Sequence, residues 1–160
     1  MSERNLHSVV QVSCTLLSIK GFELLIPNAC IDEVFKPDLL SVEDISTWCH
    51  YSTLFRGKKV YLFHLENYLQ DNPINAPFAR IAVKLKKNTA FPRLPDLAIA
   101  TSKMPKTIQA STFSLEKAYQ PAKTHRLAMS YVTINDKPAF IPDIYRLFHE
   151  FSLQMAICTA

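Results

Sequence analysis

Glycine is almost absent from this chain: its 160 residues include only two, Gly21 and Gly57, against ten prolines. The phosphate-binding loops of nucleotide- and dinucleotide-binding enzymes need several closely spaced glycines. The sequence has neither a GxGxxG nor a GxxxxGK[ST] pattern, which excludes Rossmann dehydrogenases, P-loop NTPases and protein kinases. The same scarcity excludes collagen-like and glycine-linker chains.

Signatures of metal binding and catalysis are missing as well. The four cysteines form no CxxC pair, the five histidines show no HExxH or HxH spacing, and there is no GxSxG nucleophile turn. These gaps predict a protein without cofactor, without metal and without enzymatic activity. A cysteine–histidine pair that assembles only in the folded chain stays open.

Long apolar segments are lacking too. No run of 18 apolar residues is present, and residues 1–21 do not have the pattern of a secretory signal peptide. We therefore expect a cytoplasmic protein with reduced thiols and without direct membrane insertion.

The composition that remains is that of one packed domain. Hydrophobic residues make up 48% and charged residues 20%, and a chain of this length buries about two-thirds of its surface on folding. The net charge of +4 is uneven, with −2 in residues 1–80 and +6 in residues 81–160. Because the lysines are scattered, a solvated surface explains them better than an acidic partner does.

Strand-like segments dominate the pattern. Leu17 and Ile19 alternate with polar residues, Gly21 allows a tight turn before a second strand, and Pro27 ends that strand because it has no N–H to donate. Gly57 lies at a similar junction. We expect strands at 14–20, 22–26, 58–65, 78–85, 97–100, 129–134 and 137–141, helical turns at 28–34, a helix cap at 41–44, and otherwise loop at 88–109.

A C-terminal helix is expected at 142–157, with Pro142 in its first turn. Its core-facing side is predicted by five apolar residues at helical spacing: Ile144, Leu147, Phe148, Phe151 and Met155. Trp48 and most of the cysteines are also expected to be buried.

The two halves of the chain echo one another. Each contains a strand, a turn, a strand and an aromatic-rich run, at 61–69 in the first half and at 139–147 in the second. Residues 71–77 are rich in turn formers and are the candidate boundary. This echo predicts two similar small β lobes.

Three motifs stand out in the first half: two strands around a turn at 17–26, the step Ile31-Asp-Glu-Val34, and Trp48 eight positions before the arginine of Leu54-Phe-Arg-Gly57. With these motifs, the first half resembles the CheW-like domain of bacterial chemosensory adaptors. The step His64-Leu65 then fits the end of a family strand. In the second half, Ile141-Pro-Asp-Ile144 fits the last hairpin and helix.

The chain departs from the family pattern at its glycines. Tyr51 stands where the family usually has glycine, and the second half has none of the family's glycines. This glycine-poor form is most similar to adaptors of type IV pilus (twitching) systems.

The resemblance implies a mostly β fold: two SH3-like five-stranded barrel lobes around a shared core, with short helices including one at the C-terminus. It implies a single CheW-like domain over residues 1–160, with lobes at about 14–70 and 78–148 interleaved by strand exchange at the ends. It also implies a non-catalytic adaptor in chemotaxis-like two-component signal transduction. Such an adaptor couples methyl-accepting receptors to a CheA-type histidine kinase, here with type IV pilus twitching motility as the output.

Carried over to this sequence, the resemblance places a receptor-facing groove at Ile31, Glu33 and Val34, with Arg56 and Gly57 in the turn beside it. An exposed arginine next to apolar residues can anchor a helical partner through charge-assisted hydrogen bonds. Without the resemblance, Arg56 and Glu33 are ordinary surface charges.

A second interpretation comes from a different class: a small basic β-barrel that binds single-stranded nucleic acid. Lys84, Lys86 and Lys87 would contact phosphates, but Phe78 and Phe91 flank them without sharing a strand face. Retention on single-stranded DNA that falls steeply with salt would support this interpretation.

Overall fold

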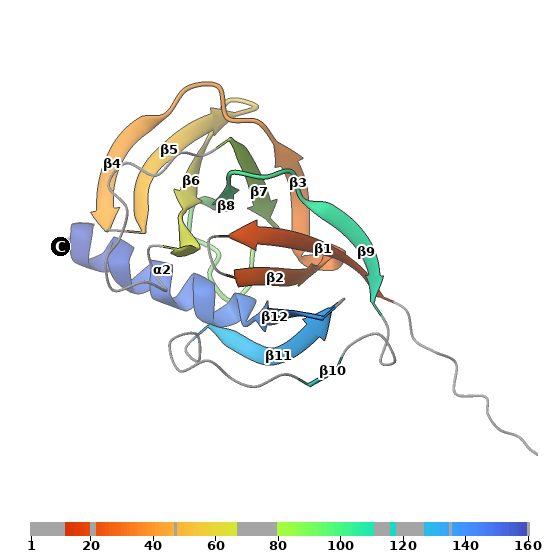
Figure 1. Cartoon of the computed structure of the whole chain (residues 1–160). Helices are drawn as coiled ribbons and strands as arrows, with labels where there is room; N and C mark the ends of the chain where they lie inside the picture. The colour runs from red at the N-terminus through yellow and green to blue at the C-terminus, as the bar shows by residue number, and fades with distance from the viewer. Residues whose placement is uncertain are drawn as a thin grey trace, which may run out of the picture.

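The computed structural model describes residues 12–19, 22–46, 48–66, 80–110, 116–117, 127–134 and 136–159. A 3-10 helix, η1 (Asn28–Cys30), connects two strands, and a helix, α2 (Ile144–Thr159), ends the described chain (Figure 1). The strands, in chain order, are β1 (Val12–Ile19), β2 (Phe22–Pro27), β3 (Ile31–Phe35), β4 (Ser41–Ser46), β5 (Cys49–Phe55), β6 (Lys58–Phe63), β7 (Ile81–Leu85), β8 (Asp96–Thr101), β9 (Lys106–Ala110), β10 (Glu116–Lys117), β11 (Ala128–Ile134) and β12 (Lys137–Pro142).

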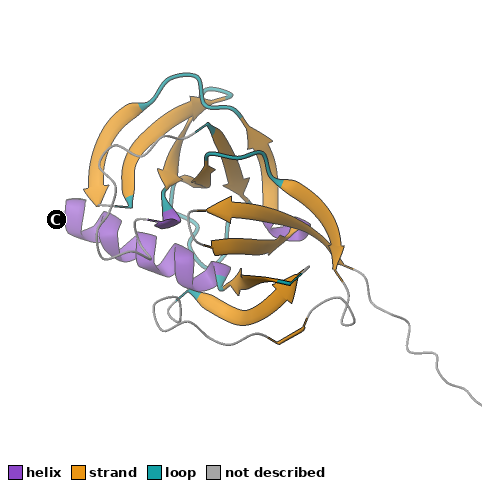
Figure 2. Ribbon diagram, viewed as in Figure 1, coloured by secondary structure: helices purple, strands orange, loops and turns teal. Residues whose placement is uncertain are grey.

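The strands form two sheets. Sheet A has the order β10-β11-β12-β2-β1-β9, and sheet B has the order β3-β7-β8-β6-β5-β4. In each sheet the central pair is parallel, β12 with β2 and β8 with β6, and the other pairs are antiparallel. Figure 2 shows the strands of both sheets and the helix that runs along them.

Each sheet combines strands from both halves of the chain. Sheet A takes β9 to β12 from the second half and the hairpin β1–β2 from the first, whereas sheet B takes β3 to β6 from the first half and the pair β7–β8 from the second. The elements repeat in order, so β1 corresponds to β7, β2 to β8 and so on to β6 and β12. Each half thus donates its first two strands to the other half's sheet.

Two hairpin turns correspond under this repeat. Phe55 pairs with Lys58 around Arg56 and Gly57, whose φ angles are 52° and 77°. At the second turn, Ile134 pairs with Lys137, and Asp136 has a φ of 65°. Positive φ at the central residues is typical of the two-residue turns that match the twist of a hairpin. The expected turn at Gly57 and hairpin at 129–141 are confirmed, while Gly21 lies outside the described residues.

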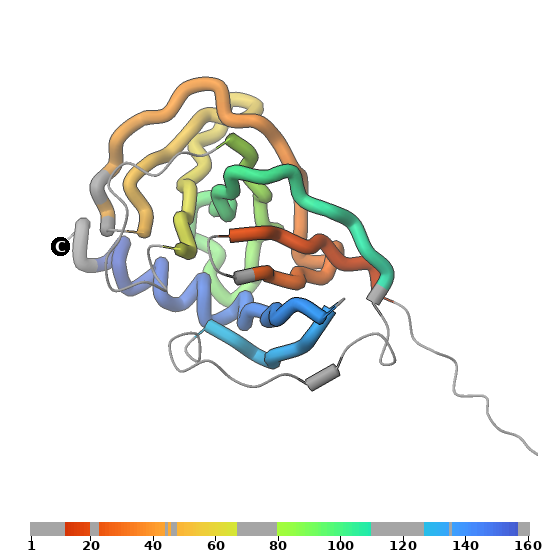
Figure 3. Tube along the Cα trace, viewed as in Figure 1, coloured from red at the N-terminus to blue at the C-terminus, as the bar shows by residue number. Residues whose placement is uncertain are grey.

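A large core is shared by both sheets and α2, and a smaller core lies within each sheet. The buried aromatic residues Trp48, Tyr61, Phe63, Phe140 and Phe151 belong to the shared core. Of the five α2 residues expected to face it, Leu147, Phe148 and Phe151 are buried, and Ile144 and Met155 pack partly buried against them. Figure 3 traces the chain through these layers.

The expected five-stranded barrels are corrected in one respect. In the part of the chain that the structure describes, each sheet has six strands, and its two end strands do not pair with each other. The mostly β, two-lobe architecture with a C-terminal helix is confirmed.

Four local expectations were wrong. Residues 41–44 form part of β4 rather than a helix cap, since Ser41 and Val42 pair with β5. The segment 28–34 makes one 3-10 turn and then becomes β3, and the expected loop at 88–109 contains β9, which pairs with β1. Pro142 ends β12 instead of starting α2.

Candidate functional site

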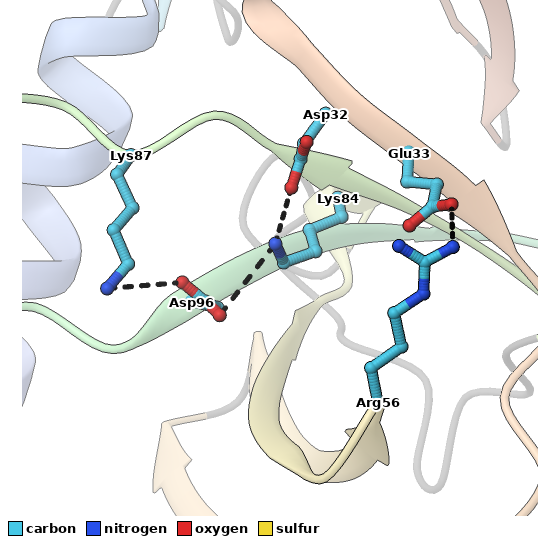
Figure 4. A network of polar contacts seen from close by, with 6 residues as sticks. All are labelled: Asp32, Glu33, Arg56, Lys84, Lys87 and Asp96. Carbon is cyan, nitrogen blue, oxygen red and sulfur yellow. Dashed lines mark hydrogen bonds and ion pairs between the residues drawn. The ribbon is translucent and has the colours of Figure 1, made fainter.

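Strand β3 carries a β-bulge at Asp32. Ile31 lies opposite Leu85 and Glu33 lies opposite Lys84, so Asp32 is the extra residue of the pair β3–β7. A bulge bends its strand and redirects the neighbouring side chains. Here the consecutive carboxylates of Asp32 and Glu33 each meet a cation from another strand or turn (Figure 4).

Glu33 accepts a hydrogen bond from Arg56, with 2.6 Å between Arg56 Nη2 and Glu33 Oε1. The Arg56 side chain is 73% exposed, and its guanidinium lies 5.1 Å from the ring centre of Phe55. Phe55 in turn stacks on Phe35, with 4.1 Å between ring centres. The guanidinium of the ion pair therefore packs on a stack of two aromatic rings.

The backbone at Arg56 is unusual. A φ of 52° places this non-glycine residue in the left-handed region. Asparagine and glycine are favoured there, and most other residues lower the stability of the fold. Such residues cluster at functional sites, where the side chain matters more than the local conformation.

Exposed apolar side chains occur on several elements of sheet B. They lie on β3, the following loop, β4 and β5: Val34, Leu39, Leu40, Val42 and Leu54. Val34 and Leu54 are the ones nearest to the ion pair in sequence, one residue from Glu33 and two from Arg56. The Thr53 hydroxyl donates to the Leu39 carbonyl oxygen at 2.7 Å, which ties the loop to β5.

The structure thus brings together residues that the sequence pattern selected from two separate segments. Glu33 and Arg56 are in direct contact, and Val34 is exposed on the same strand as Glu33. Ile31 is partly buried against the shared core. At Gly57 a Cβ would meet nothing within 4 Å, so the positive φ, not space, favours glycine there.

Sequence analysis missed Asp32, Phe55 and the exposed leucines Leu39, Leu40 and Leu54. Strict strand alternation would place the side chains of Asp32 and Glu33 on opposite faces of the sheet. That each carboxylate pairs with a cation is evident only from the bulge in the structure. Exposed Leu54 precedes Arg56 by two positions and was visible as an apolar neighbour of the turn.

A second set of ion pairs lies beside the Arg56–Glu33 pair (Figure 4). Lys84 Nζ lies 2.5 Å from Asp32 Oδ2 and 3.8 Å from Asp96 Oδ2, and Lys87 Nζ lies 3.7 Å from Asp96 Oδ1. The hydrogen bond from Lys84 lowers the pKa of Asp32, and Lys86 and Arg56 add to this effect. Lys84 and Lys87 thus face carboxylates, whereas Lys86 is exposed.

An open pocket of about 320 Å³ adjoins this group. Its lining comes from η1, the segment after β7 and the start of α2: Ala29, Cys30, Lys86, Lys87, Asn88, Thr89, Ile144 and Phe148. Among the described residues, no cluster of three or more histidine, cysteine, aspartate or glutamate side chains could hold a metal ion. Within those same ranges, no helix combines the length and apolar character needed to cross a membrane.

The fold consists of two β lobes that exchange strands, with a helix packed on their shared core. Among solved structures, it is similar to the crystal structure of the scaffolding protein TtCheW from Thermoanaerobacter tengcongensis, with a TM-score of 0.66 and 11% sequence identity. The match covers 89% of this chain and 91% of that one. The CheW-like fold is thereby established over most of the chain. No family model matches the sequence, and no curated protein matches it.

Proposed function

We propose that this protein is a non-enzymatic adaptor of a bacterial chemotaxis-like signalling system. It binds methyl-accepting receptors and a CheA-type histidine kinase in the cytoplasm, and the output is type IV pilus twitching motility. The likeness to a CheW scaffolding protein supports the class. The glycine-poor sequence, which resembles twitching adaptors, supports the pilus output.

The observation that carries the binding site is the exposed Arg56–Glu33 pair, with exposed Val34 and Leu54 close to it in sequence. The guanidinium has donors to spare beyond the bond to Glu33, and can donate to a carboxylate or carbonyl of a partner helix. Exposed Val34 and Leu54 provide apolar area for the partner to bury.

Coupling then follows from differential affinity. The adaptor binds receptor and kinase at the same time, so a receptor state that it binds more tightly is stabilised together with one kinase state. No chemical step is needed for this function.

The first test is recovery of partners. The tagged protein is used to capture proteins from its native cytosol, and partners are identified by mass spectrometry. A methyl-accepting receptor or a large histidine kinase supports the proposal. Nucleic acid in the eluate without either protein contradicts it and favours the basic-barrel interpretation.

The second test replaces Arg56 in two ways. Arg56→Ala removes the anchor, and Arg56→Asn removes it while placing a residue suited to the positive φ at this turn. We expect both variants to bind the cytoplasmic tip of the captured receptor about tenfold more weakly, in the range of side chains that anchor an interface. The melting temperature of Arg56→Asn should equal or exceed that of the wild type, because an exposed ion pair contributes little stability.

Lys137→Ala provides the matched control, because Lys137 is an exposed cation at the corresponding hairpin of sheet A. Its receptor affinity should remain that of the wild type. Equal losses in the Arg56 and Lys137 variants, or a marked fall in the melting temperature of Arg56→Asn, would show that Arg56 is not a specific partner contact.

A further inference from the structure

Lys84 is an unusual lysine because its side chain is only 15% exposed. It lies on β7, opposite Glu33 of β3 and opposite Ala98 of β8. Its neighbours on that sheet face, two residues away along each strand, include buried Ala82 and Ala100. An ammonium group in such surroundings is destabilising unless carboxylates pair with it.

The two carboxylates that pair with Lys84 differ in burial. The Asp96 side chain is 6% exposed, and its Oδ1 atom has no hydrogen bond within the described part of the chain. The Asp32 side chain is 47% exposed. Asp96 is thus held inside the lobe, while Asp32 on the bulge is restrained chiefly by its bond to Lys84.

We infer that Lys84 is a positioning residue for the Arg56–Glu33 pair: it connects the buried Asp96 to the bulge at Asp32 and so sets the direction of Glu33. Asp32 and Glu33 share a peptide unit, so a rotation of the bulge that frees Asp32 also displaces Glu33 from Arg56. The consequence for partner binding rests on the proposed function, whereas the positioning itself does not.

The test uses two variants that break the connection at different points. Asp32→Asn removes the exposed carboxylate charge. The double variant Lys84→Met/Asp96→Asn removes the buried ammonium together with the carboxylate that would otherwise be left unpaired and buried.

The main measurement is the NMR signal of the Arg56 side-chain Nε–Hε group, which responds to the pairing of the guanidinium. Glu33→Gln provides the reference for the unpaired state. We expect the Arg56 signal of both variants to move toward that reference, and receptor-tip affinity to fall about fivefold, within the range for residues coupled in one network. Lys84→Arg keeps the positive charge, so its Arg56 signal and its receptor-tip affinity should both stay at the wild-type values.

The matched control is Lys86→Met, a neighbouring exposed lysine that also lowers the pKa of Asp32. Its Arg56 signal should stay at the wild-type position. An unchanged Arg56 signal in Asp32→Asn and in the folded double variant overturns the positioning role. A shifted signal, combined with wild-type receptor binding by Arg56→Ala, upholds the positioning role and refutes the proposed partner site.

Discussion

His64 is a fully buried histidine in the loop that follows β6. Its backbone N–H donates to the Trp48 carbonyl oxygen at 2.8 Å, but neither ring nitrogen has a hydrogen-bond partner among the described residues. Burial lowers the pKa of His64 to about 4, and the nearby His50 contributes to this shift. The folded protein therefore holds the ring neutral, whereas the unfolded chain titrates near its usual value.

This difference predicts a loss of stability in mild acid. A lowered pKa means that the stabilisation is complete above the unfolded value of 6.5 and is lost as the pH falls toward 4. For that pKa difference, the free energy of unfolding should drop by about 2 kcal/mol between pH 7.5 and pH 5 through this residue alone. Urea denaturation at both pH values provides the measurement.

His64→Leu isolates the contribution, because all other titrating groups stay the same. Among them is Glu66, whose pKa is raised by burial and whose effect has the opposite sign. The variant should lose about 2 kcal/mol less than the wild type over this pH interval. An identical loss in both proteins would mean that His64 is protonated in the folded state without a cost.

The sequence analysis selected Glu33 and Arg56 as site residues but did not predict the contact between them. Their 23-residue separation is bridged because β3 and the β5–β6 turn meet at one end of sheet B. The bulge at Asp32 has no local signature, since it depends on the register that β3 adopts against β7. The charge pairing of Lys84 was missed for the same reason.

At the scale of the element, the start of α2 differs from expectation in an informative way. Pro142 remains in β12, opposite Ala128, and Asp143 takes the capping position. Its Oδ1 accepts a hydrogen bond from the Arg146 N–H at 3.1 Å, and its own N–H donates to the Leu127 carbonyl oxygen at 2.6 Å. The carboxylate also complements the positive end of the helix dipole.

Asp143→Ala should therefore destabilise the protein by about 1 kcal/mol, the usual value for a lost helix cap. Asp143→Asn keeps the side-chain acceptor and should retain most of that stability. Thermal or urea denaturation of the three proteins measures the difference. Equal stability of Asp143→Ala and the wild type would show that α2 is held by its packed apolar face alone.

Elements with local signals were predicted well, and elements with remote partners were not. The hairpins β1–β2 and β11–β12 combine alternating side chains with turn residues a few positions apart, and β6 follows the turn at Gly57. β4 carries a local capping pattern that pairing with β5 overrides. β9 is polar and short, and it becomes a strand only because β1, far back in the chain, pairs with it.

At the scale of the whole molecule, the exchange of strands makes the two halves interdependent. Sheet A needs β1 and β2, and sheet B needs β7 and β8. A separated half would expose the central edge of an incomplete sheet and lose part of the shared core.

We therefore predict that fragments 1–75 and 76–160 do not fold separately and that they associate when mixed. Each fragment alone should give a poorly dispersed NMR spectrum, and the mixture should recover the dispersion and the cooperative melting of the intact chain. The control is an intact protein cleaved at an engineered protease site in residues 71–77, which should remain folded. A fragment with a well-dispersed spectrum of its own would contradict the prediction.

The echo between 61–69 and 139–147 correctly indicated that the fold contains a repeat. It did not reveal which strands pair, because strand order depends on contacts between segments far apart in the sequence. The true correspondence is also shifted by one residue from that echo: the turn at 55–58 corresponds to the turn at 134–137.

The reciprocal donation of β1–β2 and β7–β8 has a consequence for ancestry. A polypeptide of half this length, carrying the same elements, completes its sheet only by giving its first two strands to a second copy and taking that copy's in return. Such a chain would exist as an intertwined dimer with a two-fold axis through the common core. Gene duplication and fusion would convert that dimer into one polypeptide and release its two halves to diverge. One half could then keep the cationic turn at Arg56, while the other places asparagine and aspartate at the equivalent position.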